Sequence, residues 1–312
     1  MLIWSLMTDY DLPSTARPAQ RRARLRASLT AGRPLILPGA SDAAGAMLIE
    51  RAGFDACYAT GAGISNAQFG LPDIGLVSQT EVLQQAGRMV QAMNLPLIVD
   101  ADTGYGGIPS VIRTVQLFEQ AGVAGLQFED QVMPKRCGHF DGHQLIESVE
   151  MQAKIAAAVS ARDDENLVII ARTDAAGVLG IDEALRRGHD YLAAGADALF
   201  IEAPRTEAEM ARIGRELAGV PLVANIVEGG KTPARSVAEL AELGFTIMLY
   251  ANYLMRSMLF AGEDALRHLL QVGETESRAD RMQSWQVRQS MFKLDAFGDI
   301  EDHFLGQYGV AK

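Results

Sequence analysis

The sequence is poor in cysteine: its 312 residues include only Cys57 and Cys137. Two cysteines do not provide the disulfide framework of a small secreted protein, so we expect a reducing compartment, the cytoplasm. Cys57 lies in the apolar run 56–59 and is predicted to be a core residue. Cys137 has polar neighbours and is considered below.

Long apolar runs and excess positive charge are also missing. No run approaches the ~20 apolar residues that span a membrane. The apolar opening, residues 1–7, is too short for the core of a signal peptide, and acidic residues follow it. The net charge of −11 argues against a broad nucleic-acid-binding surface. The one basic segment, residues 20–29, fits an amphipathic helix packed by Leu25 and Leu29. We therefore expect neither a membrane nor a nucleic acid as a partner.

Short apolar runs alternate with helical patterns eight times along the chain. The expected strands are residues 35–38, 55–59, 97–100, 124–129, 167–172, 198–202, 222–225 and 246–250. The expected helices are near 42–52, 79–93, 110–121, 148–161, 181–194, 207–217 and 236–243, with a long last helix ending about residue 271. We expect a long loop between the second strand and the helix at 79–93.

Alternating βα units with apolar strands predict a parallel sheet covered on both faces. Eight such units fit an α/β fold of the closed (β/α)₈ barrel type, the TIM barrel. We divide the chain into an N-terminal helical extension (1–30), a catalytic barrel (31–273) and a C-terminal helical extension (274–312). A doubly wound open sheet would need fewer strands and a phosphate loop, and Gly61-Ala62-Gly63 is only half of such a motif.

Polar residues follow the expected strands, where a barrel carries its active site. They are Thr60-Gly61, Asp100-Ala101-Asp102, Glu129-Asp130, Arg172-Thr173-Asp174, Glu202 and Asn225. Several carboxylates on one face repel each other unless a cation lies among them. Asp100, Asp102 and Glu129 offer oxygen ligands only, which predicts a site for Mg²⁺ or Mn²⁺. Alternatively, some of these carboxylates cap helices or pair with arginines.

A loop of unusual length, residues 131–147, follows the fourth strand, whereas βα loops usually have about 2–6 residues. It contains Pro134-Lys135-Arg136-Cys137-Gly138-His139. Cationic neighbours lower the pKa of a thiol, so Cys137 can act as an acid or a nucleophile at neutral pH. With Gly138 and Gly142 as hinges, the loop is a candidate lid over the barrel mouth. The competing interpretation is a solvated basic loop with an incidental cysteine.

Together these motifs resemble the isocitrate lyase/phosphoenolpyruvate mutase superfamily. The resemblance covers about residues 30–300 and is carried by Pro38–Ala43, Phe69–Asp73, Val99–Gly106, Gln127–Asp130, Lys135–His139 and Ala171–Asp174. It is strongest to the group of 2-methylisocitrate lyase, 2,3-dimethylmalate lyase and petal death protein. It implies Mg²⁺-dependent retro-aldol (Claisen-type) cleavage of a 2-hydroxy di- or tricarboxylate, with release of pyruvate or a related 2-oxo acid. It also implies a homotetramer, a dimer of dimers that exchange the eighth helix.

The resemblance also implies a role for each site residue. Asp100 and Asp102 would hold the metal, directly or through water, with Asp73 and Glu129 around its water shell. The substrate-binding residues would be Thr60, Gly61 and Ala62 at the α-carboxylate, Arg172 at the oxyanion or a carboxylate, and Glu202 and Asn225 at the second carboxylate region. In catalysis, Tyr58 would help to deprotonate the hydroxyl. Cys137 would protonate the carbanion, and its thiolate would be stabilised by Lys135, Arg136 and His139.

Two features depart from the methylisocitrate lyases. Residues 225–233 look more like the dimethylmalate and petal death group, and Ala251 stands where methylisocitrate lyases carry proline and oxaloacetate hydrolases carry serine. The alternatives are oxaloacetate hydrolysis or decarboxylation and, on the same barrel, cleavage of a carbon–phosphorus bond. Phosphonate enzymes and decarboxylases of the superfamily generally lack the Lys-Arg-Cys-Gly-His motif. A barrel without catalytic activity would be expected to lose some of these site residues, and none is lost.

Overall fold

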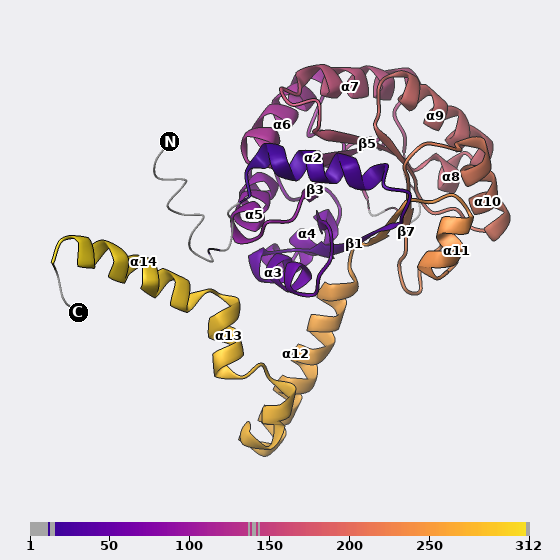
Figure 1. Ribbon diagram of the computed structural model, residues 1–312. Coiled ribbons are helices and arrows are strands. Elements are labelled where there is room, and N and C mark those ends of the chain that lie inside the picture. Colours follow the sequence, from indigo (N-terminus) through magenta and orange to yellow (C-terminus); the bar gives the residue numbers. More distant parts are fainter. Residues whose placement is uncertain (1–11, 13–15, 137, 139–141, 143, 310–312) are drawn as a thin grey trace.

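Eight parallel strands close into a barrel, each paired with the next in chain order and the last with the first (Figure 1). The strands are β1 (Leu35–Ala40), β2 (Cys57–Ala59), β3 (Leu97–Asp100), β4 (Gly125–Glu129), β5 (Val168–Thr173), β6 (Ala198–Ile201), β7 (Leu222–Asn225) and β8 (Ile247–Tyr250). The structure is a computed structural model that describes residues 12, 16–136, 138, 142 and 144–309. It confirms the predicted (β/α)₈ barrel and excludes an open sheet, because Leu35 of β1 is in register with Ile247 of β8.

Helices surround the barrel and follow the strands. They are α3 (Ala43–Arg51), α4 (Gly61–Phe69), α5 (Gln79–Ala92), α6 (Ile108–Gln120), α7 (Ser148–Ala161), α8 (Ala175–Val178), α9 (Ile181–Ala193), α10 (Glu207–Glu216) and α11 (Val237–Glu242). Side chains alternate along most of the strands between two buried clusters. In β3, Val99 belongs to the cluster that includes the surrounding helices, whereas Ile98 belongs to the cluster inside the barrel. This alternation explains why the strands read as continuous apolar runs.

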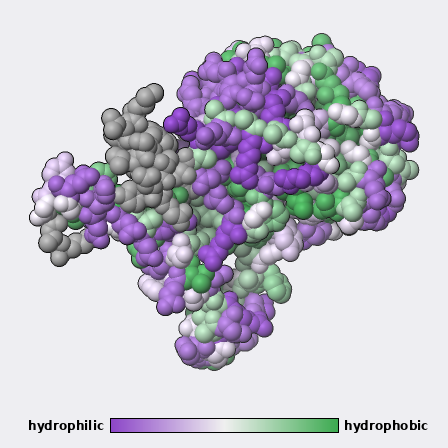
Figure 2. Space-filling view, viewed as in Figure 1, coloured by the Kyte–Doolittle hydropathy of each residue, from purple (hydrophilic) through white to green (hydrophobic). Residues whose placement is uncertain are grey.

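Helix α2 (Pro18–Leu29) closes the amino-terminal end of the barrel. Its Leu25 and Leu29 join the interior cluster, as predicted. The basic side chains of this helix bind main-chain carbonyls: Arg21 donates to Met93 O at 2.8 Å and Arg22 to Val123 O at 3.1 Å. The outward face of α2 mixes alanines with polar side chains (Figure 2). Because α2 covers this end, the carboxyl ends of the strands form the accessible mouth.

One prediction was wrong between β2 and α5, where we expected a long loop. The structure has helix α4 there, directly after β2. Glycines at 61 and 63 weaken the helical signal of this segment. The Thr60 side chain nevertheless caps the helix by accepting a hydrogen bond from Gly63 N at 3.2 Å, and Gly70 ends it at φ 63°. Helix α4 places residues 60–62 at a helix amino terminus rather than in a flexible loop.

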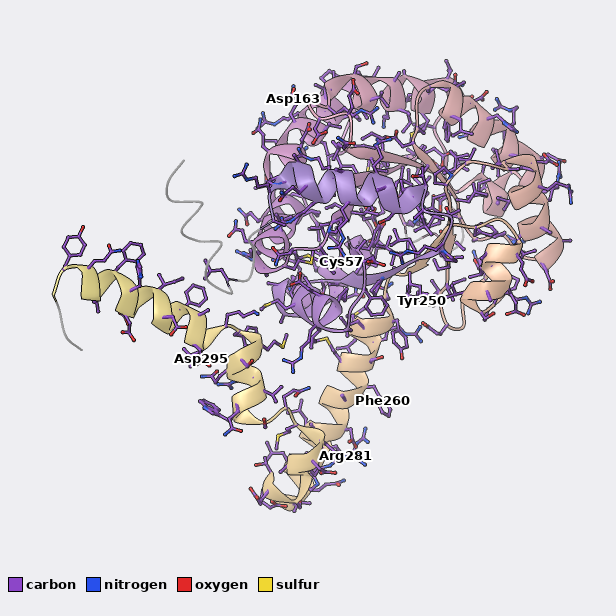
Figure 3. All side chains as sticks on the ribbon, in the orientation of Figure 1. Cys57, Asp163, Tyr250, Phe260, Arg281 and Asp295 are labelled. Atoms are coloured by element: carbon purple, nitrogen blue, oxygen red, sulfur yellow. The ribbon has the colours of Figure 1, made fainter. Side chains whose placement is uncertain are left out.

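The C-terminal segment leaves the barrel as α12 (Tyr253–Val272) and continues through η1 (Glu276–Arg281), α13 (Trp285–Met291) and α14 (Leu294–Gln307) (Figure 1). It carries many exposed apolar side chains. Phe260 is 76% exposed and projects from α12 (Figure 3), and Leu270 is 88% exposed. Among the described residues, no helix has the length and apolar character needed to cross a membrane.

Candidate active site

A cavity of about 230 Å³ opens at the carboxyl ends of the strands. It is lined by Tyr58, Thr60, Ala62, Asp73, Asp100, Glu129, Lys135, Arg136, Gly138, Arg172, Glu202, Asn225, Val227, Leu249, Ala251 and Asn252. Most of the predicted site residues therefore meet in one place. Of the rest, Gly61 and Asp102 lie immediately behind this wall, and Cys137 and His139 lie outside the described residues.

Asp73, Asp100, Asp102 and Glu129 form what we call the acidic cluster. Asp100 ends β3, and its Oδ1 accepts hydrogen bonds from Asp102 N at 3.2 Å and from Gln127 Nε2 at 3.3 Å. Asp102 has φ 48°, in the left-handed region that aspartate tolerates better than most residues. Its carbonyl accepts from Glu129 N at 2.9 Å. The strained turn after β3 is thus tied to β4, with Asp100 on the cavity wall and Asp102 directly behind it.

Gly61 lies directly beside this cluster. A Cβ at position 61 would lie 3.0 Å from Asp100 Oδ2 and 3.6 Å from Asp102 Oδ1. Glycine therefore lets the start of α4 approach the carboxylates closely.

The ammonium group of Lys135 reaches the acidic cluster from the loop after β4. Its Nζ lies 2.5 Å from Asp73 Oδ1 and 2.8 Å from Asp102 Oδ1, and the side chain is 4% exposed. In the part of the chain that the structure describes, no three His, Cys, Asp or Glu side chains are already grouped to hold an ion. Instead, Lys135 supplies positive charge to the cluster.

One ammonium does not balance the negative charge of the cluster. Burial, followed by the charge of Asp102, raises the pKa of Asp100 to about 6. Burial also raises the pKa of Glu129 well above its usual range, although Arg172 and Lys135 oppose this shift. For Lys135, burial alone would lower the pKa, but the surrounding carboxylates, led by Asp102, raise it well above normal. The four carboxylates of the cluster thus face two cations, Lys135 and Arg172, and Nε of Arg172 lies 3.5 Å from Glu129 Oε2.

The donor atoms of the acidic cluster are of the type that a hard divalent cation binds. Glu129 Oε1 is buried and has no hydrogen-bond partner among the described residues. Buried carboxylate oxygens without partners are costly unless a cation or water satisfies them. All four side chains offer oxygen, which is the ligand type of Mg²⁺ and Mn²⁺.

Arg172 is held in one orientation at the end of β5. Its Nε and Nη2 donate to the two carboxylate oxygens of Asp174 at 3.0 and 2.9 Å. Its Nη1 lies 3.9 Å from Glu202 Oε2, and the guanidinium stacks 4.9 Å from the centre of the Phe200 ring. Burial alone would lower the pKa of Arg172, but Asp174, Glu202 and Glu129 raise it well above normal. Arg172 is therefore a permanent, oriented cation on the cavity wall.

Glu202 and Asn225 form a second polar pair. Asn225 Nδ2 lies 3.3 Å from both carboxylate oxygens of Glu202. The amide oxygen of Asn225 is buried and accepts no hydrogen bond from the described residues. Glu202 thus orients the amide, and Asn225 keeps an acceptor for a hydroxyl group.

The amino terminus of α4 faces the same cavity. Thr60 caps the helix and its hydroxyl also lies 3.3 Å from Asn252 Oδ1, while Ala62 lines the wall. The first main-chain N–H groups of a helix have no partner within the helix, and the helix dipole favours an anion there. Thr60 N already donates to Ala40 O at 3.2 Å, so the main-chain N–H groups that can bind a carboxylate here are those of Gly61 and Ala62.

Tyr58 is buried beside the acidic cluster. Its hydroxyl donates to Gln127 Oε1 at 2.6 Å, and Gln127 Nε2 donates in turn to Asp100. Burial, followed by the charge of Asp100, raises the pKa of Tyr58 well above its usual value. The tyrosine is thus a neutral phenol in the structure, and its part in deprotonating a substrate remains a prediction.

Residues 131–147 follow β4, and we call them the lid loop. The two ends of this loop, its stem, are joined by hydrogen bonds. Gln131 forms an antiparallel bridge with Leu145, and Val132 N donates to Gln144 O at 2.7 Å. The side chain of Gln131 binds the main chain of Arg136 in both directions, at 2.8 and 2.9 Å.

Gly138 brings the lid loop to Arg172. A Cβ at position 138 would collide with Arg172 Nη2, and it would lie 2.7 Å from Glu202 Cγ and 2.9 Å from Asp174 Oδ1. Only glycine fits this close approach. Gly138 of the lid loop therefore contacts the cavity wall at Arg172.

Sequence reasoning missed two groups of site residues. Gln127 joins Tyr58 to Asp100, and its spacing of two from Glu129 on β4 could have placed it on the same inward face. Val227 and Leu249 form an apolar part of the wall beside Ala251, which the sequence already marks as a departure from the methylisocitrate lyases. Apolar residues near strand ends carry no chemical signal in a sequence, so only the fold identifies them.

Comparison with known proteins gives one consistent family. The phosphoenolpyruvate phosphomutase family model matches residues 25–270. The 2,3-dimethylmalate lyase of Eubacterium barkeri is 43% identical over 282 residues, which cover 90% of this chain and 97% of the relative. The 2-methylisocitrate lyase of Shewanella oneidensis is 40% identical over 279 residues, covering 89% and 94%.

Solved structures agree with this assignment. A 2,3-dimethylmalate lyase superposes with a TM-score of 0.86 at 32% identity, covering 94% of this chain and 98% of the other. An oxaloacetate acetylhydrolase bound to 3,3-difluorooxalacetate gives 0.85 at 30% identity, with 95% and 99% covered. A phosphonopyruvate hydrolase in complex with oxalate and Mg²⁺ gives 0.83 at 30% identity, with 91% and 99% covered.

Proposed function

This chain belongs to the phosphoenolpyruvate mutase/isocitrate lyase superfamily, and the two sequence relatives named above are lyases. We propose that it cleaves a carbon–carbon bond of a 2-hydroxy di- or tricarboxylate. The substrate would resemble 2,3-dimethylmalate or 2-methylisocitrate, the substrates after which two relatives are named. The observation that carries this proposal is the meeting of the acidic cluster with Arg172 and Gly138 of the lid loop in one cavity.

The proposed cofactor is Mg²⁺, for which Mn²⁺ can substitute. Asp100 and Asp102 would hold it, with Asp73 and Glu129 around its water shell. When bound, a divalent cation lowers the pKa of a hydroxyl and polarises a carbonyl oxygen. The oxygen donors of the acidic cluster and the unpartnered Glu129 Oε1 support this proposal, as does the Mg²⁺ complex of the related phosphonopyruvate hydrolase.

In the proposed binding mode, the amino terminus of α4 binds the carboxylate next to the hydroxyl through residues 60–62. The pair of Glu202 and Asn225 faces the other part of the substrate. The apolar wall of Val227, Leu249 and Ala251 suits an alkyl substituent better than a further charged group. This wall supports a substrate with methyl groups.

In the proposed reaction, the bond between the hydroxyl-bearing carbon and its neighbour breaks. The hydroxyl passes its proton, with help from Tyr58, to a carboxylate of the acidic cluster, and its oxygen becomes the carbonyl of the 2-oxo acid. The bonding electron pair stays on the neighbouring carbon and spreads into its carboxylate as an enediolate. The fixed charge of Arg172 stabilises this anion as it forms.

The carbanion then takes a proton from Cys137. The cations beside it in sequence, Lys135, Arg136 and His139, would stabilise the thiolate that remains. The products are a 2-oxo acid such as pyruvate and a carboxylate that carries the new C–H bond. Lys135 and Arg136 line the cavity, which supports their place in this step.

Hydrolysis of oxaloacetate is the second candidate, since a structural relative is an oxaloacetate acetylhydrolase. It would use the same cavity with water as the attacking group, and it would release oxalate rather than pyruvate. Carbon–phosphorus chemistry is a weaker candidate, supported by the phosphonopyruvate hydrolase relative.

A substrate panel tests these proposals. The purified protein is incubated with Mg²⁺ and 2-methylisocitrate, isocitrate, 2,3-dimethylmalate, citramalate or oxaloacetate, and pyruvate, glyoxylate and oxalate are measured. Pyruvate from a methylated hydroxy acid supports the lyase. Oxalate from oxaloacetate alone would replace it with the hydrolase, and turnover of none of the five would contradict both.

We also propose that the protein is a cytoplasmic homotetramer in which α12 is exchanged between subunits. The exposed apolar side chains of the C-terminal segment support the assembly, because large apolar surfaces on soluble proteins mark interaction sites. The low cysteine content and the reduced thiol that the reaction needs support the compartment.

A further inference from the structure

Asp130 is a fully buried carboxylate that lies next to the site without lining the cavity. It follows Glu129 directly, so its side chain points away from the barrel interior, toward the helices. Oδ2 accepts three hydrogen bonds, from Thr173 Oγ1 at 2.7 Å, Tyr191 OH at 2.7 Å and Arg187 Nη1 at 2.9 Å. Oδ1 accepts a fourth, from Asp174 N at 3.0 Å. The proposed reaction uses none of these contacts.

Two of the four bonds fix the turn that holds Arg172. Thr173 and Asp174 follow Arg172 directly, and Asp130 binds the side chain of the first and the main chain of the second. The carboxylate of Asp174 then grips Nε and Nη2 of Arg172. The orientation of the guanidinium thus depends on a chain of contacts that ends at Asp130.

The other side of Asp130 reaches the stem of the lid loop. Arg187 Nη1 donates both to Asp130 and to Ile146 O, at 2.9 and 3.0 Å. Ile146 N donates to the carbonyl of Asp130 itself at 2.9 Å. The same residue therefore anchors the end of the lid loop and the turn behind Arg172.

We propose that Asp130 is a positioning residue. It sets the orientation of Arg172 through Asp174, and it holds the lid-loop stem in place through Arg187. The inference rests on the proposed function of Arg172 but not on the identity of the substrate. Asp130 touches neither substrate nor metal. Its carboxylate accepts from four donors at once, and these hydrogen bonds hold the turn at residues 173–174 in one conformation.

The test replaces Asp130 by asparagine, which keeps the shape but cannot accept from all four donors. The turn relaxes, Asp174 shifts, and the guanidinium leaves its productive position. Misplacement of about 1 Å can cost about 10²-fold in rate, so we expect kcat to fall by that order. KM should change little, because the α4 terminus and the cluster are intact, which is the signature of an interaction made in the transition state.

The control is the same chemical change at the other end of the barrel. Glu119 is also buried, accepts from Asp163 N and Asp164 N at 2.9 and 2.8 Å, and lies 3.6 Å from Arg22. Glu119→Gln should lower the melting temperature and leave kcat at the wild-type value. A loss of kcat in both variants that follows their loss of stability would overturn the proposal.

Binding of oxalate in the presence of Mg²⁺, measured by calorimetry, tests the role of Asp130 independently of the substrate that the protein cleaves. Oxalate is planar and dianionic, like the enediolate, so Asp130→Asn should bind it more weakly than wild type and Glu119→Gln should not. If the wild type cleaves none of the hydroxy acids, this comparison of oxalate affinities still tests whether Asp130 positions Arg172. A folded Asp130→Asn protein with wild-type oxalate affinity would disprove the positioning role.

A milder variant covers the case in which Asp130→Asn does not fold. Thr173→Val keeps the size of the side chain and removes one donor to Asp130. It should show a smaller loss of kcat and oxalate affinity in the same direction. A folded Thr173→Val protein with both values unchanged would count against the proposal.

Discussion

Lys135 Nζ lies 2.8 Å from Asp102 Oδ1, so a cation of the lid loop is bound to a carboxylate of the turn after β3. Lys135 also contacts Asp73, and it is almost completely buried. The lid loop and the acidic cluster therefore share charge. A change in the charge of the cluster should therefore shift the position of the loop.

Removal of divalent metal should abolish activity. The proposed chemistry depends on a bound cation, and the four carboxylates of the acidic cluster offer the oxygen ligands for it. Treatment with EDTA should stop turnover, and Mg²⁺ or Mn²⁺ should restore it. Mg²⁺ should also raise the melting temperature, because it binds only the folded state. Full turnover in a thoroughly chelated sample would rule out the metal.

Mg²⁺ affinity should fall as the pH decreases through about 6, the pKa of Asp100 in the metal-free protein. Protons compete with the metal for this carboxylate. Without metal the sign is opposite for stability. The folded pKa of Asp100 is raised above the unfolded value of about 3.9, so its contribution to stability is full below that value and is lost as the pH rises through about 6.

Calorimetric titration of Mg²⁺ and melting curves in EDTA, each from pH 4.5 to 7.5, measure the two effects. Asp100→Asn is the control and should remove this part of the pH dependence from the melting curves. Identical pH profiles for wild type and Asp100→Asn in EDTA would show that Asp100 titrates with an ordinary pKa.

Cys137→Ser should lose the protonation step specifically. A serine hydroxyl is a far weaker acid than a thiol, and general acid catalysis is worth about 10²–10⁴-fold, so kcat should fall by at least that much. Oxalate should still bind, because its proposed contacts lie on the barrel. Intact mass should show no adduct on the wild type during turnover. A near-normal kcat in the variant, or a trapped covalent adduct, would argue against an acid role.

Gly138→Ala should prevent the lid loop from seating. A Cβ at this position would collide with Arg172 Nη2, which Asp174 holds in place. We expect kcat to fall by about 10²-fold, as for other misplaced catalytic groups, without a change in circular dichroism. Gly87→Ala is the control, because a Cβ there meets nothing within 4 Å and its helix should gain stability. Equal activity of the two variants would show that the approach of Gly138 to Arg172 has no catalytic role.

The wild-type protein should be a tetramer by light scattering at micromolar concentration. Leu270 on α12 is 88% exposed in the single chain, so Leu270→Asp should cost a lone subunit little and should break the assembly. Val149→Asp on α7, at a side chain that is 70% exposed, should leave the tetramer intact. A monomeric wild type would remove the basis for the exchanged helix.

The sequence by itself determined the barrel fold and the set of polar residues at the carboxyl ends of its strands. Eight apolar runs of strand length, such as Leu97–Asp100, can be buried on both faces only in a parallel sheet with covering helices. The polar residues that follow them must then meet at one end. The cavity confirms that Asp100, Glu129, Arg172, Glu202 and Asn225 do so.

Only the tertiary structure decided which of these groups touch. Helix α4 forms despite two glycines because Thr60 caps it and because it packs against the barrel. Lys135 enters the acidic cluster, Gly138 meets Arg172, and Asp130 joins Arg187 to the turn at Asp174. Each of these contacts joins segments that are distant in sequence. Local pattern records the preference of a residue for strand, helix or turn, whereas the partner of a loop side chain depends on how separate βα units are brought together when the barrel closes.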